Sequence, residues 1–171
     1  MAQRDAITAY LDGMLPVADI DDPSFNGLQV EGRETVSKIV MGVTAGKQLF
    51  ARAAELEASY IIVHHGHYWR YGTPSLTGWE KRRLDILLQH NISLYASHLP
   101  LDKHPKIGNN IQLLNILNAE VSGDFSQHGE GSSRCTCRTS AIASRPSSVT
   151  ECASASRSRA RSRSTLPTSS S

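Results

Sequence analysis

A strand, a helix and a second strand are encoded in the stretch KIVMGVTAGKQLFARAAELEASYIIVHH, residues 38–65. Residues 38–43 are apolar and β-branched, which favours a strand, and residues 60–63 repeat that pattern. Between them, residues 46–58 carry apolar side chains at helical spacing, namely Leu49, Phe50, Ala53 and Leu56. Because strands joined through a helix lie parallel in one sheet, this stretch predicts an α/β protein.

The pattern continues toward the C-terminus. Residues 79–90 predict a second helix and residues 92–96 a third strand, followed by a helix over 109–118 and a fourth strand over 119–125. The fold class that we expect is therefore α/β, with a mostly parallel sheet flanked by helices.

Toward the N-terminus, apolar residues within 6–15 recur at three- and four-residue spacing and predict a helix that stops before Pro16. The next segment, residues 19–32, contains Asp22-Pro23 and Asn26-Gly27, which are strong turn signals. We expect this segment to be a loop.

Charge and composition differ sharply between the body and the end of the chain. Residues 1–130 carry 11 Lys and Arg against 15 Asp and Glu, whereas residues 131–171 carry 7 Arg against 1 Glu. An acidic body argues against nucleic acid as its partner, since phosphate binding needs clustered cations. Without a signal peptide or an apolar run of membrane-spanning length, the protein is expected in the cytoplasm, with no membrane partner.

The last residues have the composition of a disordered segment. From Gly131 onward there is no aromatic residue, and Ser, Arg, Ala and Thr dominate. The sequence thus predicts an N-terminal α/β metal-binding half over residues 1–127 and a disordered Ser/Arg-rich tail over 128–171. The abrupt change near Glu130 indicates a reading-frame shift, and a nucleic-acid-binding arm is the alternative. All the cysteines lie in this tail, so the body has no thiolate metal site: Cys135, Cys137 and Cys152.

Candidate metal ligands follow two neighbouring strands. His64 and His65 end one apolar run, while His98 and Asp102 follow the next. The carboxyl ends of parallel strands meet at one edge of a sheet, and imidazole and carboxylate are ligands for zinc, manganese, iron or nickel. Adjacent strand residues point to opposite sides, which suits two ions rather than one. The alternative is that both histidines only hydrogen-bond the backbone at a strand end.

The sequence does not decide which role each residue of the second pair, His98 and Asp102, has. Asp102 is the stronger ligand candidate, whereas His98 is either a ligand or a hydrogen-bond partner that orients the carboxylate. With Pro100 between them, the two are expected to line a loop rather than share a helical turn.

Other residues have competing interpretations. His67 either lines the pocket or lies exposed in a loop, His90 ends a helix, and His104 and His128 are expected at the surface. Thr44 fits a helix N-cap better than a phosphate-binding turn. Three aromatic residues either stack on a heterocyclic substrate or anchor their loop, namely Trp69, Tyr71 and Trp79.

Five segments in order resemble the N-terminal half of the NIF-three-like family, whose bacterial members are called GTP cyclohydrolase I type 2 homologues. They are NGLQVEG (26–32), IVMGVT (39–44), IIVHHG (61–66), LYASHLPLD (94–102) and GNN (108–110). The resemblance implies an α/β fold, a homohexameric ring and a dinuclear centre of two divalent metal ions. His64 and His65 would each hold one metal and Asp102 would bind as a third ligand, with His98 close by.

The resemblance also implies a function. It suggests a metal-dependent hydrolase that attacks a purine nucleotide with metal-activated water; a non-enzymatic metal-binding scaffold or ring-forming protein is the alternative. The family completes its site with a His and a Glu from a C-terminal segment, whereas this chain has no His beyond His128. We therefore expect an uncovered apolar sheet edge, low solubility, weakened metal binding and activity impaired by the loss of the C-terminal half.

Overall fold

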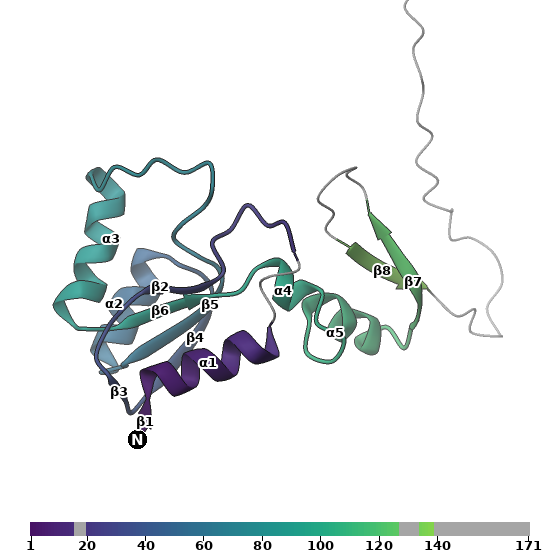
Figure 1. Ribbon diagram of the computed structural model, residues 1–171, viewed down its shortest axis with the longest axis horizontal. Helices are drawn as coiled ribbons and strands as arrows, with labels where there is room; N and C mark the ends of the chain where they lie inside the picture. Colours follow the sequence, from purple (N-terminus) through teal and green to yellow (C-terminus); the bar gives the residue numbers. More distant parts are fainter. Residues whose placement is uncertain (16–19, 127–133, 139–171) are drawn as a thin grey trace, which may run out of the picture. The chain divides into compact units, whose positions relative to one another are not determined.

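The central feature of the computed structural model is a four-stranded sheet with the strand order β2-β6-β5-β4 (Figure 1). The structure describes residues 1–15, 20–126 and 134–138. Strands β4 (Ile39–Thr44), β5 (Tyr60–His65) and β6 (Ser93–Ala96) are parallel neighbours. The predicted α/β class with a mostly parallel sheet is confirmed.

One edge of this sheet differs from the prediction. Strand β2 (Gly27–Val30) lies inside the segment expected to be a loop, and it pairs antiparallel with β6. The turn signals precede this strand, and the four residues of β2 pair with a strand that lies more than sixty positions away in sequence. Local patterns contain no information about such a partner, so the expectation of a loop was wrong here.

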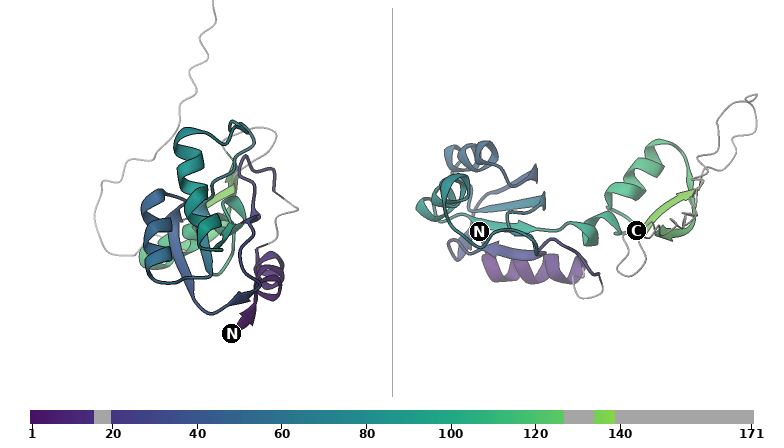
Figure 2. Two further views of the ribbon diagram at one scale, coloured as in Figure 1. Left: turned by 90° about the vertical axis from the view of Figure 1, so that its left-hand side faces the viewer. Right: turned by 90° about the horizontal axis from the view of Figure 1, so that it is seen from above.

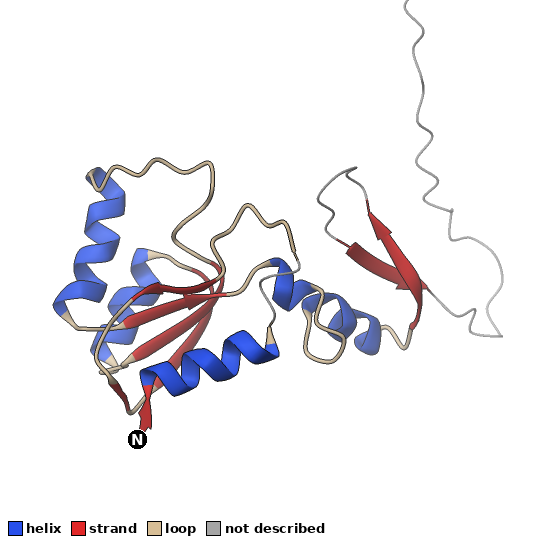
Figure 3. Ribbon diagram, in the orientation of Figure 1, coloured by secondary structure: helices blue, strands red, loops and turns tan. Residues whose placement is uncertain are grey.

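Helices cover both faces of the sheet, α1 (Arg4–Met14) on one and α2 (Lys47–Glu55) with α3 (Gly78–Gln89) on the other (Figures 2 and 3). The short strands β1 (Ala2–Gln3) and β3 (Thr35–Val36) pair antiparallel beside α1. All three helices lie where the apolar spacing predicts them, within a few residues at each end.

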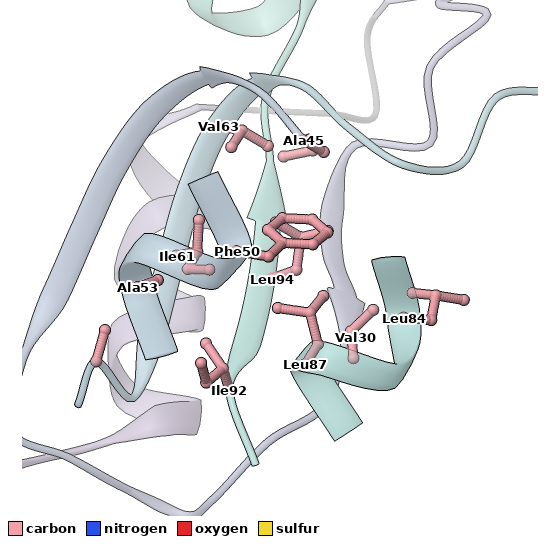
Figure 4. Packing of buried hydrophobic residues seen from close by; sticks show 12 residues of the cluster. Val30, Ala45, Phe50, Ala53, Ile61, Val63, Leu84, Leu87, Ile92 and Leu94 are labelled. Atoms are coloured by element: carbon pink, nitrogen blue, oxygen red, sulfur yellow. The ribbon is translucent and has the colours of Figure 1, made fainter. Parts of the chain in front are cut away.

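Alternation along β5 divides the core into two clusters. Tyr60 points toward α1 and packs with Tyr95, whereas Ile61 and Val63 point toward α2 and α3. On that second side Phe50 is fully buried at the centre of the cluster (Figure 4). Because a parallel strand is buried on both faces, its residues form a continuous apolar run rather than an alternating one.

Strand β4 is an edge of this sheet, and part of it is uncovered. Val40 packs into the core, while Ile39, Met41 and Val43, which alternate with it, are 43%, 76% and 68% exposed. These residues form the uncovered apolar edge that the sequence predicts. Solubility itself remains a prediction.

Beyond the sheet, the chain forms α4 (Leu99–Asp102) and α5 (Asn109–Ile116) and a hairpin of β7 (Glu120–Ser126) with β8 (Arg134–Arg138). Strand β7 confirms the fourth predicted strand, although its partner is β8 rather than the central sheet. Strand β8 lies in the segment expected to be a disordered tail, so that expectation does not hold for its five residues. The remaining tail, with Cys152 and His128, lies outside the described residues, and the boundary at 127/128 stays a prediction.

Gly32 provides a test of this packing. A Cβ at this position would lie 2.5 Å from the backbone nitrogen of Ser93 and 2.6 Å from the carbonyl oxygen of Asn91, and neither backbone atom can move freely. Overpacking of this kind usually costs about 1–3 kcal/mol. We expect Gly32→Ala to lower the free energy of unfolding by that amount in urea denaturation.

Gly13, inside α1, is the matched control for this substitution. A Cβ there meets no atom within 4 Å, so Gly13→Ala should raise the free energy of unfolding by about 0.5–1 kcal/mol. Equal effects of the two substitutions would contradict the close contact at Gly32.

Candidate metal site

The carboxyl ends of β5 and β6 bring three histidines together. His64 and His65 are the last residues of β5, and His98 follows β6 directly before α4. One ring nitrogen from each lies within 4.8 Å of the others, and each side chain is partly buried. The ring centroids of His64 and His65 are 4.5 Å apart, so the two neighbours lie side by side at the strand end. Their proximity to one another differs from the expectation that adjacent strand residues diverge.

His64 is oriented by the backbone. Its Nδ1 lies 3.0 Å from the carbonyl oxygen of Ser97, and because a carbonyl only accepts, Nδ1 carries the proton and donates it. In this tautomer the lone pair is on Nε2. That nitrogen lies 3.6 Å from Oδ1 of Asp102, so the free lone pair and the carboxylate face the same space.

His98 is held by Asp22, whose sequence context predicts only a turn. Its Nδ1 lies 2.9 Å from Oδ1 of Asp22, and its backbone N–H donates to Oδ1 of Asn26 at 2.6 Å. As with His64, the ring is fixed through Nδ1, and Nε2 stays free. The Asp22-Pro23 and Asn26-Gly27 turn signals were the only sequence features that marked these two residues.

Asp22 is an ionised carboxylate inside the protein. Burial alone raises the pKa of this group, but hydrogen bonds outweigh burial and leave the pKa below its ordinary value. The donors are the side chains of Asn26 and His98 and the backbone N–H groups of Ser24 and Leu99. With these donors around it, the carboxylate acts only as an acceptor.

His65 completes the cluster. Burial lowers its pKa, and the neighbouring rings of His64 and His98 lower it further, so that the neutral, ligand-competent ring is favoured. Its Nδ1 lies 3.1 Å from the hydroxyl of Thr44. Thr44 is the last residue of β4, and its hydroxyl contacts the site. The prediction that Thr44 caps the next helix was wrong, because the N-cap of α2 is Gly46.

Asp102 lies on the same turn as His98, contrary to the predicted loop. The Asp102 backbone N–H donates to the carbonyl oxygen of His98 at 3.1 Å, which is a helical hydrogen bond across α4. Pro100 is near the start of this turn, where its missing N–H leaves no helical bond unmade. The amide of Asn109 donates to Oδ1 of Asp102 at 2.7 Å and orients the carboxylate.

This donor set fits a divalent ion. A zinc–nitrogen bond is about 2.0–2.1 Å, so two nitrogens that share one ion lie at most about 4.2 Å apart. The three ring nitrogens lie within 4.8 Å of one another, so small side-chain movements would bring them to that separation. Each imidazole is hydrogen-bonded at Nδ1, which leaves the other nitrogen for a metal, and such outer contacts are typical of metal-binding histidines.

Aromatic residues form one side of the cluster. The ring of Trp69 lies 5.1 Å from that of His98 and 6.4 Å from that of His65, and its indole N–H donates to the carbonyl oxygen of Gly66. Tyr71 is 84% exposed, and Trp79 packs against Arg83 instead. Of the three aromatic candidates, Trp69 is the one that lies against the histidine cluster.

The remaining described histidines lie elsewhere. His67 packs against Tyr68 and Trp79, and burial lowers its pKa, so it is neither an exposed loop residue nor a member of the cluster. His90 ends α3, as predicted. His104 accepts backbone N–H groups from the loop that follows it.

A surface hollow of about 530 Å³ lies apart from the cluster and includes Arg33 and Lys38 in its lining. Both cations already donate to backbone carbonyl oxygens at helix ends, Arg33 to that of His90 and Lys38 to that of Leu56. Within the part of the chain that the structure describes, the hollow has no group of metal-ligating side chains comparable to the histidine cluster.

Among the described residues, no helix is both long and apolar enough to cross a membrane.

Fold and site together define an α/β protein with a histidine–carboxylate group at the carboxyl edge of its parallel strands. A family model for Duf34/NIF3 (NGG1p interacting factor 3) matches residues 2–163. The chain belongs to this family, as the sequence resemblance predicts.

Individual relatives agree with this assignment. The chain is 49% identical over 115 residues to a protein named GTP cyclohydrolase 1 type 2 homolog from Salmonella typhimurium, covering 67% of this chain and 47% of that protein. The solved structure of a protein named ybgI matches with a TM-score of 0.69 and 45% identity, over 72% of this chain and 50% of the other. TTHA1606 from Thermus thermophilus matches with a TM-score of 0.67 and 43% identity, over 74% and 56%. The chain spans about half the length of the curated relatives it matches.

Proposed function

We propose that this chain binds divalent metal through His64, His65 and His98, with Asp102 as a further ligand beside His64. The convergence of the three imidazole nitrogens within 4.8 Å carries the proposal. The family resemblance extends it to two ions, one held by each of the adjacent histidines. Zinc, manganese, iron and nickel all accept this combination of imidazole and carboxylate ligands.

The reaction that we propose is hydrolysis of a purine nucleotide, of the GTP cyclohydrolase type. When bound by these histidines and Asp102, a divalent ion would supply an activated water and polarise the bond under attack. The chain's own groups would orient the reactants. His64 and His98 each present Nε2 toward the site, and Asp102 lies close enough to bind or to accept a proton. The ring of Trp69 lies beside the cluster, where it would limit the access of water from that side. The names of the curated relatives support this reaction class.

Turnover of GTP by metal-reconstituted protein tests the enzymatic part. We expect weak activity in the wild-type chain, because the family's C-terminal ligands are missing, and its complete loss in His64→Ala and Asp102→Ala, because each substitution removes a group beside the proposed ion. His90→Ala is the matched control, since its exposed ring ends α3 away from the site and activity should be unchanged. Products would be followed by chromatography.

Metal binding without turnover in the wild-type chain would contradict the hydrolase and favour the alternative, a non-enzymatic metal-binding scaffold that assembles into a ring. The family resemblance implies a homohexamer, and this self-association is a proposal for the present chain. Light scattering on the metal-loaded protein would measure the mass of the assembly directly.

A further inference from the structure

Asp22 is one of the most deeply buried charged groups that the structure describes. Its side chain is only 2% exposed, yet it contacts none of the candidate ligands except His98. The contact joins Oδ1 to the Nδ1 of His98 across 2.9 Å and 76 positions of sequence. A buried carboxylate is costly unless it is hydrogen-bonded, so a residue of this kind calls for a specific role.

We propose that Asp22 is a positioning residue that holds His98 in the Nδ1–H tautomer and aims its Nε2 at the metal. This inference rests on the proposed metal site. A carboxylate that accepts from Nδ1–H leaves the lone pair of the neutral imidazole on the opposite nitrogen, which is the one that can bind an ion.

The surroundings of Asp22 require an acceptor at both oxygens. Oδ1 receives the backbone N–H of Ser24 as well as the ring of His98, and Oδ2 receives the backbone N–H of Leu99 and the amide of Asn26. An asparagine at this position would place an NH₂ group against one of these donor pairs. The NH₂ would turn toward His98, because the His98 ring is the donor that can become an acceptor by changing its tautomer. The ring would then carry its proton on Nε2 and block the metal-binding nitrogen.

The loop around Asp22 holds the same histidine at a second point. Oδ1 of Asn26 accepts the backbone N–H of His98, so this ligand candidate is clamped through both its backbone and its ring. Asp22 also accepts the backbone N–H of Leu99, the first residue of α4. One carboxylate therefore anchors both the ring of His98 and the start of the turn that carries Asp102.

The experiment measures the tautomer in metal-free protein. Long-range ¹H–¹⁵N spectra at about pH 8.5, where unperturbed imidazole is neutral, separate Nδ1–H from Nε2–H rings, and the His98 signals are assigned by their absence in His98→Ala. We expect the Nδ1–H form in the wild-type chain. The Nε2–H form there would overturn the proposal without the use of any Asp22 variant.

The second measurement is zinc affinity in Asp22→Asn, with folding checked by circular dichroism. We expect a 10- to 100-fold weaker affinity together with a shift of His98 toward Nε2–H, about the cost of losing such an outer partner. Asp12→Asn is the matched control, because it alters a carboxylate that accepts from Tyr95 and does not touch His98. A folded Asp22→Asn protein with wild-type affinity and tautomer would refute the positioning role. Failure of the wild-type chain to bind zinc, with the Nδ1–H tautomer intact, would instead count against the metal site.

Discussion

Replacing His64 by alanine should lower the affinity of this chain for a divalent ion by at least about 100-fold. Loss of an outer hydrogen-bond partner of a metal ligand typically costs about 10–100-fold, and His64 is proposed to contact the ion itself. It also contacts all three of the other site residues, since its ring lies beside those of His65 and His98 and its Nε2 lies 3.6 Å from Asp102. The substitution therefore removes the ligand that links the histidine cluster to the carboxylate.

Competition of the wild-type chain and the variant against a zinc-responsive dye would give both dissociation constants. His104→Ala is a suitable control, since this ring contacts the loop after α4 and should leave the affinity unchanged. Metal at a concentration of about 100 Kd should also raise the free energy of unfolding of the wild-type chain by about 2.7 kcal/mol, and its thermal midpoint should rise accordingly. Equal affinities for the wild-type chain and His64→Ala would show that the ion, if bound, lies elsewhere.

Replacing Phe50 by alanine should lower the free energy of unfolding by about 3–5 kcal/mol. Phe50 is fully buried in the cluster between the sheet and α2 with α3, where it packs with residues of β5 and β6 (Figure 4). Native domains are stable by only about 5–15 kcal/mol, so this single cavity would remove a large part of the total.

Chemical denaturation followed by tryptophan fluorescence would measure this loss. Phe25→Ala is the matched control because its ring is 56% exposed, and a change within about 0.5 kcal/mol is expected there. A loss below about 1 kcal/mol in Phe50→Ala would mean that the core between the sheet and these helices is not packed as described.

Periodicity in the sequence was sufficient to predict the parallel part of the fold. The apolar runs that became β5 and β6 are continuous because these strands are buried on both faces, the run that became β4 is equally apolar although one of its faces is exposed, and helical spacing between the runs predicted α2 and α3. The same strand ends indicated where His64, His65, His98 and Asp102 would meet. That part of the site could be predicted because it follows from sheet topology.

The errors share a physical cause. Strand β2 exists because β6 offers it a hydrogen-bonded edge, and α4 forms because His98 and Asp102 are held by the buried Asp22 and by Asn109. Thr44 was expected to cap a helix, but its hydroxyl lies next to His65 on the neighbouring strand. In each case a tertiary contact outweighed a weak local preference.

The sequence by itself therefore determined the α/β class, the order of the parallel strands along the chain and the edge at which ligands collect, because these follow from local periodicity and chain connectivity. Only the tertiary structure decided which nitrogen each histidine presents. That choice depends on the hydrogen bonds that His64 donates to Ser97 and that His98 donates to Asp22, which join residues 33 and 76 positions apart. Interactions over such separations arise only when the chain is folded, and no local pattern encodes them.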